Sequence, residues 1–136
     1  MDELASFTRK FTDEVPEYTK VGMFAFAGVV KSKVDAPLLY CSTRLGEFGR
    51  GGFFPSIPLL RWVASRTDKK AVVNEKSAWL FSCKKNILKE GIISNTVKRG
   101  AVIVVNEQGE VFGWGEVTGA GITNKLDIGD YLRRER

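Results

Sequence analysis

Two stretches of the C-terminal half decide the fold: Ala71-Val-Val-Asn-Glu-Lys-Ser-Ala-Trp-Leu-Phe-Ser-Cys-Lys-Lys-Asn-Ile-Leu-Lys-Glu-Gly-Ile92 and Arg99-Gly-Ala-Val-Ile-Val-Val-Asn-Glu-Gln-Gly-Glu-Val-Phe-Gly-Trp-Gly115. The second predicts a β-hairpin, because an apolar strand over residues 101–105 precedes a turn at residues 106–109 and a returning strand. The first predicts a short strand over residues 71–73, a compact segment that carries Trp79, and a Lys84–Lys85 pair.

The charge balance favours an acidic partner. The 136 residues include 21 Lys and Arg against 16 Asp and Glu, which gives a formal charge of +5. This balance is typical of nucleic-acid binding, although many soluble proteins carry a basic surface of the same size.

The chain contains no histidine, which argues against most catalytic and metal chemistry. The absence removes the commonest general base, the Ser-His and Cys-His nucleophile pairs, and histidine-containing zinc sites. Cys41 and Cys83 lack the close spacing of a metal site, and we interpret both as buried or half-buried apolar residues. The glycine-rich stretch over residues 42–52 lacks the Gly-Lys-Ser/Thr of a P-loop. We therefore expect a protein that is not an enzyme and uses no cofactor or metal.

The sequence predicts no membrane association. No apolar run reaches the roughly 18 residues of a membrane span, and residues 1–6 do not begin a secretory leader. We expect a cytoplasmic location, or a nuclear or nucleolar one if the source is eukaryal.

The N-terminal half mixes helix and strand patterns. The spacing of Leu4, Phe7 and Phe11 predicts an amphipathic helix of three turns with these residues in the core. Two strands are expected over residues 21–30 and 38–41, and a helix begins after a Ser56 cap with Pro58 in its first turn. A polar joint over residues 66–70 separates two predicted domains, residues 1–67 and 68–136.

The two C-terminal stretches together resemble the PUA domain, an RNA-binding module. Residues 126–134, Leu-Asp-Ile-Gly-Asp-Tyr-Leu-Arg-Arg, and residues 45–49, Leu-Gly-Glu-Phe-Gly, are similar to the Nip-seven family of large-subunit ribosome-assembly factors. The resemblance implies an α+β fold, with a mixed N-terminal domain followed by a PUA pseudo-barrel of about six strands. It also implies an archaeal-type, monomeric, non-catalytic factor that binds rRNA or a pre-ribosomal particle and acts in rRNA processing, with other assembly proteins as partners.

The resemblance also implies where RNA binds. In PUA domains a surface near the first helix holds structured RNA, and many PUA domains have glycine at the position of Lys84. The residues predicted to bind RNA here are Lys84, Lys85, Lys89, Arg99, Lys125, Arg133 and Arg134. Lysines suit phosphate contacts that supply affinity without reading sequence. We favour the lysines that follow Phe81 over the terminal arginines, because residues 119–124 are neutral.

Several alternatives stay open on sequence alone. Trp62 and Trp79 lie in apolar runs and are interpreted as core, and packing is also favoured for Trp114, although aromatic side chains can stack on unpaired bases. The protein could instead be a PUA-bearing accessory protein in tRNA modification or translation, or a protein-interaction adapter. An RNA-modifying enzyme is a weaker alternative, because no aspartate lies in a recognisable catalytic motif.

Overall fold

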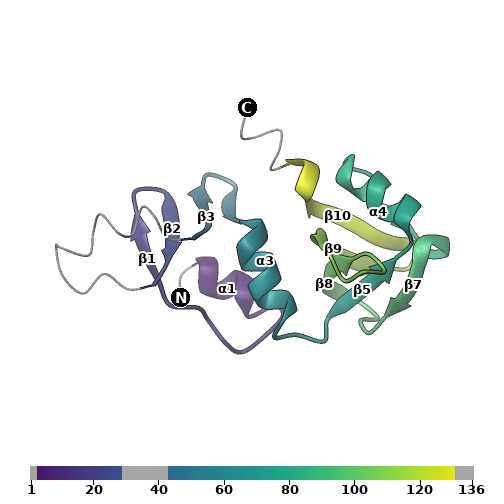
Figure 1. The fold of residues 1–136 in the computed structure, drawn as a ribbon, viewed down its shortest axis with the longest axis horizontal. Helices are drawn as coiled ribbons and strands as arrows, with labels where there is room; N and C mark the ends of the chain where they lie inside the picture. Colours follow the sequence, from purple (N-terminus) through teal and green to yellow (C-terminus); the bar gives the residue numbers. More distant parts are fainter. Residues whose placement is uncertain (1–2, 29–42, 131–136) are drawn as a thin grey trace. The chain divides into compact units, whose positions relative to one another are not determined.

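The computed structural model describes residues 3–28 and 43–130, and the chain forms two compact units, Met1–Val63 and Ala64–Arg136. Both units combine helices and strands, which confirms the predicted α+β class (Figure 1).

The N-terminal unit contains a four-stranded antiparallel sheet in the order β1-β2-β3-β4. Its elements are α1 (Glu3–Thr8), β1 (Tyr18–Val21), β2 (Phe24–Ala27), β3 (Arg44–Gly49), β4 (Gly52–Pro55) and α3 (Ile57–Ala64). Helix α1 packs against β4. The rings of Phe7 and Phe53 lie 6.0 Å apart between centroids, so this contact joins the helix to the sheet through aromatic side chains.

The predicted N-terminal core is confirmed, but the helix is shorter than predicted. Leu4, Phe7 and Phe11 are buried. The helix ends at Thr8, whose hydroxyl donates a 3.1 Å hydrogen bond to the carbonyl of Ala5, and Phe11 reaches the core from the turn that follows. A threonine hydroxyl that bonds a preceding carbonyl competes with the helix hydrogen bonds, which is consistent with an end at this point.

The strand predicted from residue 21 begins later than predicted, at Phe24 of β2, and Val21 belongs to β1. The chain turns at Gly22, where φ is 61°, and forms the β1–β2 hairpin instead. Only glycine adopts this backbone conformation readily, so Gly22 marks a turn inside an apolar run. The strand predicted over residues 38–41 lies outside the described residues. The cap of α3 is confirmed, because the backbone N–H of Leu59 donates to Oγ of Ser56 at 3.2 Å and Pro58 lies in the first turn.

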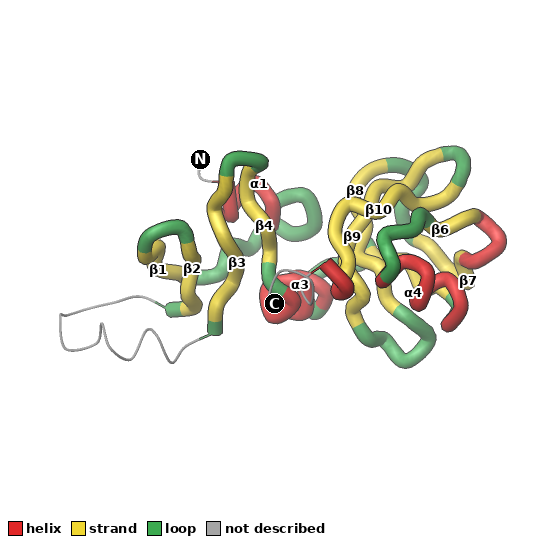
Figure 2. Tube along the Cα trace, turned by 90° about the horizontal axis from the view of Figure 1, so that it is seen from above, coloured by secondary structure: helices red, strands yellow, loops and turns green. Residues whose placement is uncertain are grey.

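The C-terminal unit contains a six-stranded sheet in the order β6-β10-β9-β8-β5-β7. Its elements are β5 (Lys70–Val73), α4 (Glu75–Ser82), β6 (Ile87–Leu88), η1 (Lys89–Gly91), β7 (Ile92–Asn95), β8 (Gly100–Val105), β9 (Val111–Thr118) and β10 (Gly121–Asp127). Strands β5 and β8 are parallel, and the other pairs are antiparallel. The sheet curls into a half-barrel, and α4 packs against β6, β9 and β10 (Figure 2).

The predicted hairpin is confirmed as β8 and β9. Asn106 closes its turn: the side-chain oxygen accepts from the backbone N–H of Gln108 at 3.1 Å and of Glu110 at 2.8 Å. Gly109, with φ of 82°, supplies the left-handed residue that the turn requires.

One face of α4 closes the core of this unit. Phe81 and Ala78 are fully buried among apolar residues of the sheet, and the ring of Phe81 lies where a Cβ on Gly113 would clash with it. The interpretation of Trp79 as a core residue is wrong, because its side chain is 64% exposed. A residue directly after a buried one is turned by about 100° around the helix, so Trp79 points away from the face of Phe81. Cys83 is also exposed, contrary to prediction.

Candidate nucleic-acid interface

The loop that follows α4 carries the predicted lysine pair and has a defined backbone shape. The backbone N–H of Lys84 donates to the carbonyl of Phe81 at 3.1 Å, and that of Lys85 donates to the carbonyl of Leu80 at 3.1 Å. These two bonds form a Schellman motif, in which the residue after the helix cap adopts the left-handed conformation. Lys84 occupies that position with φ of 67°.

Lys84 is the single non-glycine residue with positive φ in the described chain. The left-handed conformation costs a side-chain-bearing residue about 1–2 kcal/mol relative to glycine. The position at which many PUA domains carry glycine is therefore a position whose backbone favours glycine here too. Because lysine is less stable than glycine in this conformation, Lys84 is a candidate for a role outside folding.

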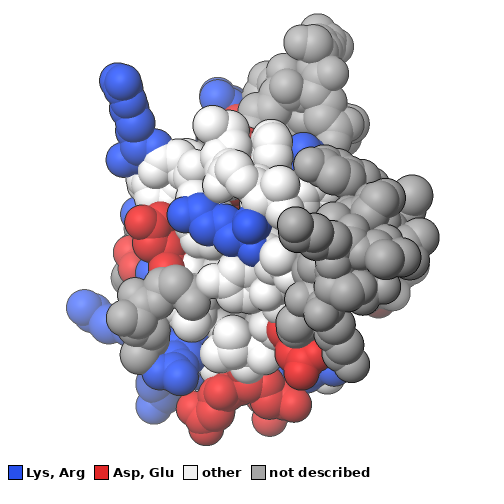
Figure 3. Space-filling view, turned by 90° about the vertical axis from the view of Figure 1, so that its left-hand side faces the viewer, with Lys and Arg blue, Asp and Glu red and all other residues white. Residues whose placement is uncertain are grey.

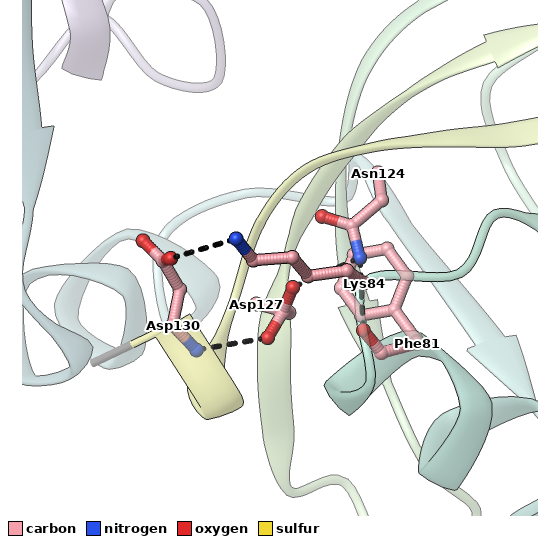
Figure 4. Close-up of polar contacts among 5 residues, drawn as sticks. All are labelled: Phe81, Lys84, Asn124, Asp127 and Asp130. Carbon is pink, nitrogen blue, oxygen red and sulfur yellow. Dashed lines mark hydrogen bonds and ion pairs between the residues drawn. The ribbon is translucent and has the colours of Figure 1, made fainter. Parts of the chain in front are cut away.

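Asn124 of β10 holds this loop against the sheet (Figure 4). Its side-chain nitrogen donates to the carbonyl of Phe81 at 2.8 Å and to the carbonyl of Lys85 at 3.3 Å. Its backbone N–H donates to Oδ1 of Asn86 at 2.9 Å. The loop is thus bonded to β10 through both the backbone and the side chain of one asparagine.

A buried carboxylate extends the same network. Asp127 is 2% exposed, and its Oδ2 accepts from the side-chain nitrogen of Asn124 at 3.1 Å. Its Oδ1 accepts from the backbone N–H of Asp130 at 3.0 Å, so Asp127 caps a helical turn that begins after it.

Lys84 reaches from the loop toward this helical turn. Its Nζ lies 3.9 Å from Oδ1 of Asp130, and its side chain is 65% exposed (Figure 4). An ion pair this long and this exposed contributes little to stability. The ammonium group of Lys84 therefore stays accessible to a phosphate.

The strand register separates the predicted RNA-binding residues into two groups. Gly100, Val117, Ile122 and Ile87 lie in one row across β8, β9, β10 and β6. Arg99 and Lys89 flank this row, at the end of the sheet where β10 begins. Lys125 lies three residues beyond Ile122 on β10, about 10 Å from this row at strand spacing, where the register shifts beside Asn124.

We call Lys84, Lys85 and Lys125 the α4-loop cluster, because the Asn124 hydrogen bonds bring the loop to the stretch of β10 that carries Lys125. All three side chains are exposed. Arg133 and Arg134, together with Arg136, lie outside the described residues. On the face of the molecule shown in Figure 3, described Lys and Arg side chains are scattered among Asp, Glu and uncharged residues.

Asn124 and Asp127 are candidate site residues that were not among the predicted ones, and only Asp127 has a signal in the sequence. Residues 119–124 form a neutral segment of the sequence, and most of them belong to β10. The partners of Asn124 lie about 40 residues earlier in the chain, so no local pattern could reveal them. Asp127 followed by Ile-Gly-Asp is a helix-cap pattern and is within reach of sequence reasoning.

Residues 3–28 and 43–130 contain neither a membrane-spanning helix nor a metal site. No helix there is long and apolar enough to cross a membrane. No three His, Cys, Asp or Glu side chains there come together in a group that could hold a metal ion.

The half-barrel with a helix at its side has the architecture of a PUA module, a class of RNA-binding domains. The UPF0113 PUA domain family model matches residues 69–136. The chain belongs to this family. A comparison with curated proteins finds no match.

Solved structures support the same fold. A conserved PUA domain protein from Thermoplasma acidophilum is similar with a TM-score of 0.58 and 16% identity, over 97% of this chain and 90% of that one. A hypothetical protein from Pyrococcus horikoshii has a TM-score of 0.59 and 13% identity, over 97% and 91%. A PUA domain from Aeropyrum pernix, solved as a tartrate complex, has a TM-score of 0.58 and 13% identity, over 93% and 82%.

Proposed function

We propose that this protein is a non-catalytic RNA-binding factor of large-subunit ribosome assembly that acts in rRNA processing. The membership of residues 69–136 in a PUA domain family supports the RNA-binding part. The assembly role rests on the similarity of residues 45–49 and 126–134 to the Nip-seven family. We place RNA binding in residues 68–136 and the protein in the cytoplasm.

The α4-loop cluster is the observation that carries this proposal. Its three lysines are exposed, and the hydrogen bonds of Asn124 fix the backbone that carries two of them. Binding to a charged partner is stronger when the binding groups are ordered in advance, because less conformational freedom is lost. Lys89 and Arg99 form a second, more distant group that contributes less, and Arg133 and Arg134 add charge at the end of the chain.

Contacts between lysine side chains and RNA phosphates do not require a bound metal or nucleotide. Purified protein should bind RNA with an affinity that chelators and added ATP change by less than about tenfold, or 1.4 kcal/mol. A larger change would contradict the non-catalytic proposal.

Crosslinking in cells, followed by sequencing of the bound RNA, tests the proposed role. We expect fragments of large-subunit rRNA or its precursor. Recovery of mainly tRNA would instead support an accessory role in tRNA modification or translation. A level of RNA equal to that of a non-binding control protein would support an adapter and overturn the proposal. The Lys84→Ala/Lys85→Ala variant is the matched control, because it should recover less of the same RNA.

A further inference from the structure

We infer that Trp79 is a stacking site for an unpaired RNA base, next to the α4-loop cluster. This inference rests on the proposed RNA-binding function and adds to it a preference for single-stranded RNA. Trp79 lies in α4, and its side chain is 64% exposed. It takes part in none of the aromatic pairs or cation–π contacts among residues 3–28 and 43–130.

Folding does not account for this tryptophan. The residues of α4 that close the core of the unit are Ala78 and Phe81, which are both fully buried. Tryptophan is highly buried on average, because its large apolar ring is costly to expose to water. Trp79 therefore presents a large apolar surface that the fold itself does not use.

The helical neighbours of Trp79 favour RNA over a protein partner. Residues three and four positions away on a helix share its face, and here they are Glu75, Lys76, Ser82 and Cys83. A protein-docking tryptophan is typically surrounded by a well-packed patch that excludes water. Polar and charged neighbours suit an aromatic ring that stacks on a base while cations hold the backbone of the same strand.

Basic residues precede and follow Trp79 along the chain. Lys76 is about 5 Å before Trp79 along the helix axis, and Lys84 lies in the loop that follows the end of the helix at Ser82. Both are exposed. Glu75 is also on this face, but it lies in the first turn, where the helix dipole stabilises a carboxylate. A single strand that runs along α4 can contact Lys76 and the α4-loop cluster while one base stacks on Trp79.

The test compares Trp79→Phe with Trp79→Leu. Phenylalanine keeps an aromatic face, whereas leucine keeps apolar bulk without one. We expect Trp79→Leu to weaken binding of a labelled single-stranded RNA by about 5- to 150-fold, and Trp79→Phe to lose much less. The dependence of affinity on salt should keep the same slope in both variants, because no cation is removed. Both variants should unfold at the wild-type temperature, since the side chain is exposed.

Two further measurements separate base stacking from a general loss of RNA affinity. On a fully paired RNA of the same length, Trp79→Leu should bind as the wild type does, because a paired base cannot stack on the ring; an equal loss there overturns the inference. Single-stranded RNA should quench the fluorescence of the wild type, and most of this change should disappear in Trp79→Phe.

The outcomes distinguish this inference from the proposed function. If the wild type binds RNA and Trp79→Leu binds it equally well, the stacking inference is wrong and the proposed RNA binding stands. The exposed ring of Trp79 would then be a contact for a protein partner. If the wild type binds neither single-stranded nor paired RNA, the proposed function fails and the stacking site fails with it.

Discussion

Two turns of the C-terminal unit are each held by an asparagine side chain. One asparagine bonds residues close to it in the sequence, and the other bonds residues far from it. In the β8–β9 turn, Asn106 bonds the backbone of residues no more than four positions away. In the loop after α4, Asn124 bonds residues 38 to 43 positions away. The first turn carries Glu107 and Glu110, whereas the second carries Lys84 and Lys85.

The β8–β9 turn shapes the fold, whereas the loop after α4 presents charged side chains. The Asn106 turn forms from local bonds, so it can organise before the rest of the sheet is in place. The loop after α4 acquires its Asn124 bonds only when β10 has paired with the sheet. Its lysines are therefore held in position by the completed fold, which is the property we expect of a binding surface.

Asn106→Ala should have the largest effect on stability. Asn106 is 3% exposed, and its side chain also donates to the carboxylate of Glu110 at 3.2 Å. Loss of three hydrogen bonds at a nearly buried position should lower the free energy of unfolding by about 3 kcal/mol. Urea denaturation measures this change. RNA affinity, measured where the variant is folded, should stay at the wild-type value, and a marked loss would show that this turn also serves binding.

Asn124→Ala should have a smaller effect on stability but a clear effect on binding. It removes the side-chain bonds to Phe81, Lys85 and Asp127, and we expect a loss of about 2 kcal/mol in the free energy of unfolding. The loop then has to be ordered during binding, which should weaken RNA affinity about fivefold. Fluorescence anisotropy with labelled RNA measures this loss of affinity. Asn106→Ala is the control, because it should lower stability without changing RNA affinity. Wild-type affinity in Asn124→Ala would break the proposed link between loop order and binding.

Lys84→Gly should raise stability by about 1 kcal/mol, because glycine adopts positive φ without the cost that lysine incurs. Thermal unfolding shows the change as a higher midpoint. Lys85→Gly is the matched control: Lys85 has no positive φ, so the same substitution one residue later should give no gain. Equal midpoints for the two variants would argue against a strained Lys84.

Sequence reasoning reaches the elements whose determinants are local. The β8–β9 hairpin, the Ser56 cap and the core face of α1 follow from turn chemistry, capping and spacing, and all three are confirmed. The prediction for Trp79 is wrong because an apolar run does not show which side of a short helix meets the core. Asn124 escapes sequence reasoning because its partners are distant in sequence, so only the three-dimensional structure brings them to the loop.

The central claim, that RNA phosphates bind the α4-loop cluster, is tested most directly by the salt dependence of RNA affinity. The measurement compares the wild type, Lys84→Ala/Lys85→Ala and Arg133→Ala/Arg134→Ala. Each lost phosphate contact lowers the slope by about one unit. We predict a slope about two units lower for the lysine pair, a smaller change for the arginine pair, and little change in stability for either. An unchanged slope in the lysine variant, with the loss found in the arginine variant, would contradict the claim and place the RNA at the C-terminal end of the chain.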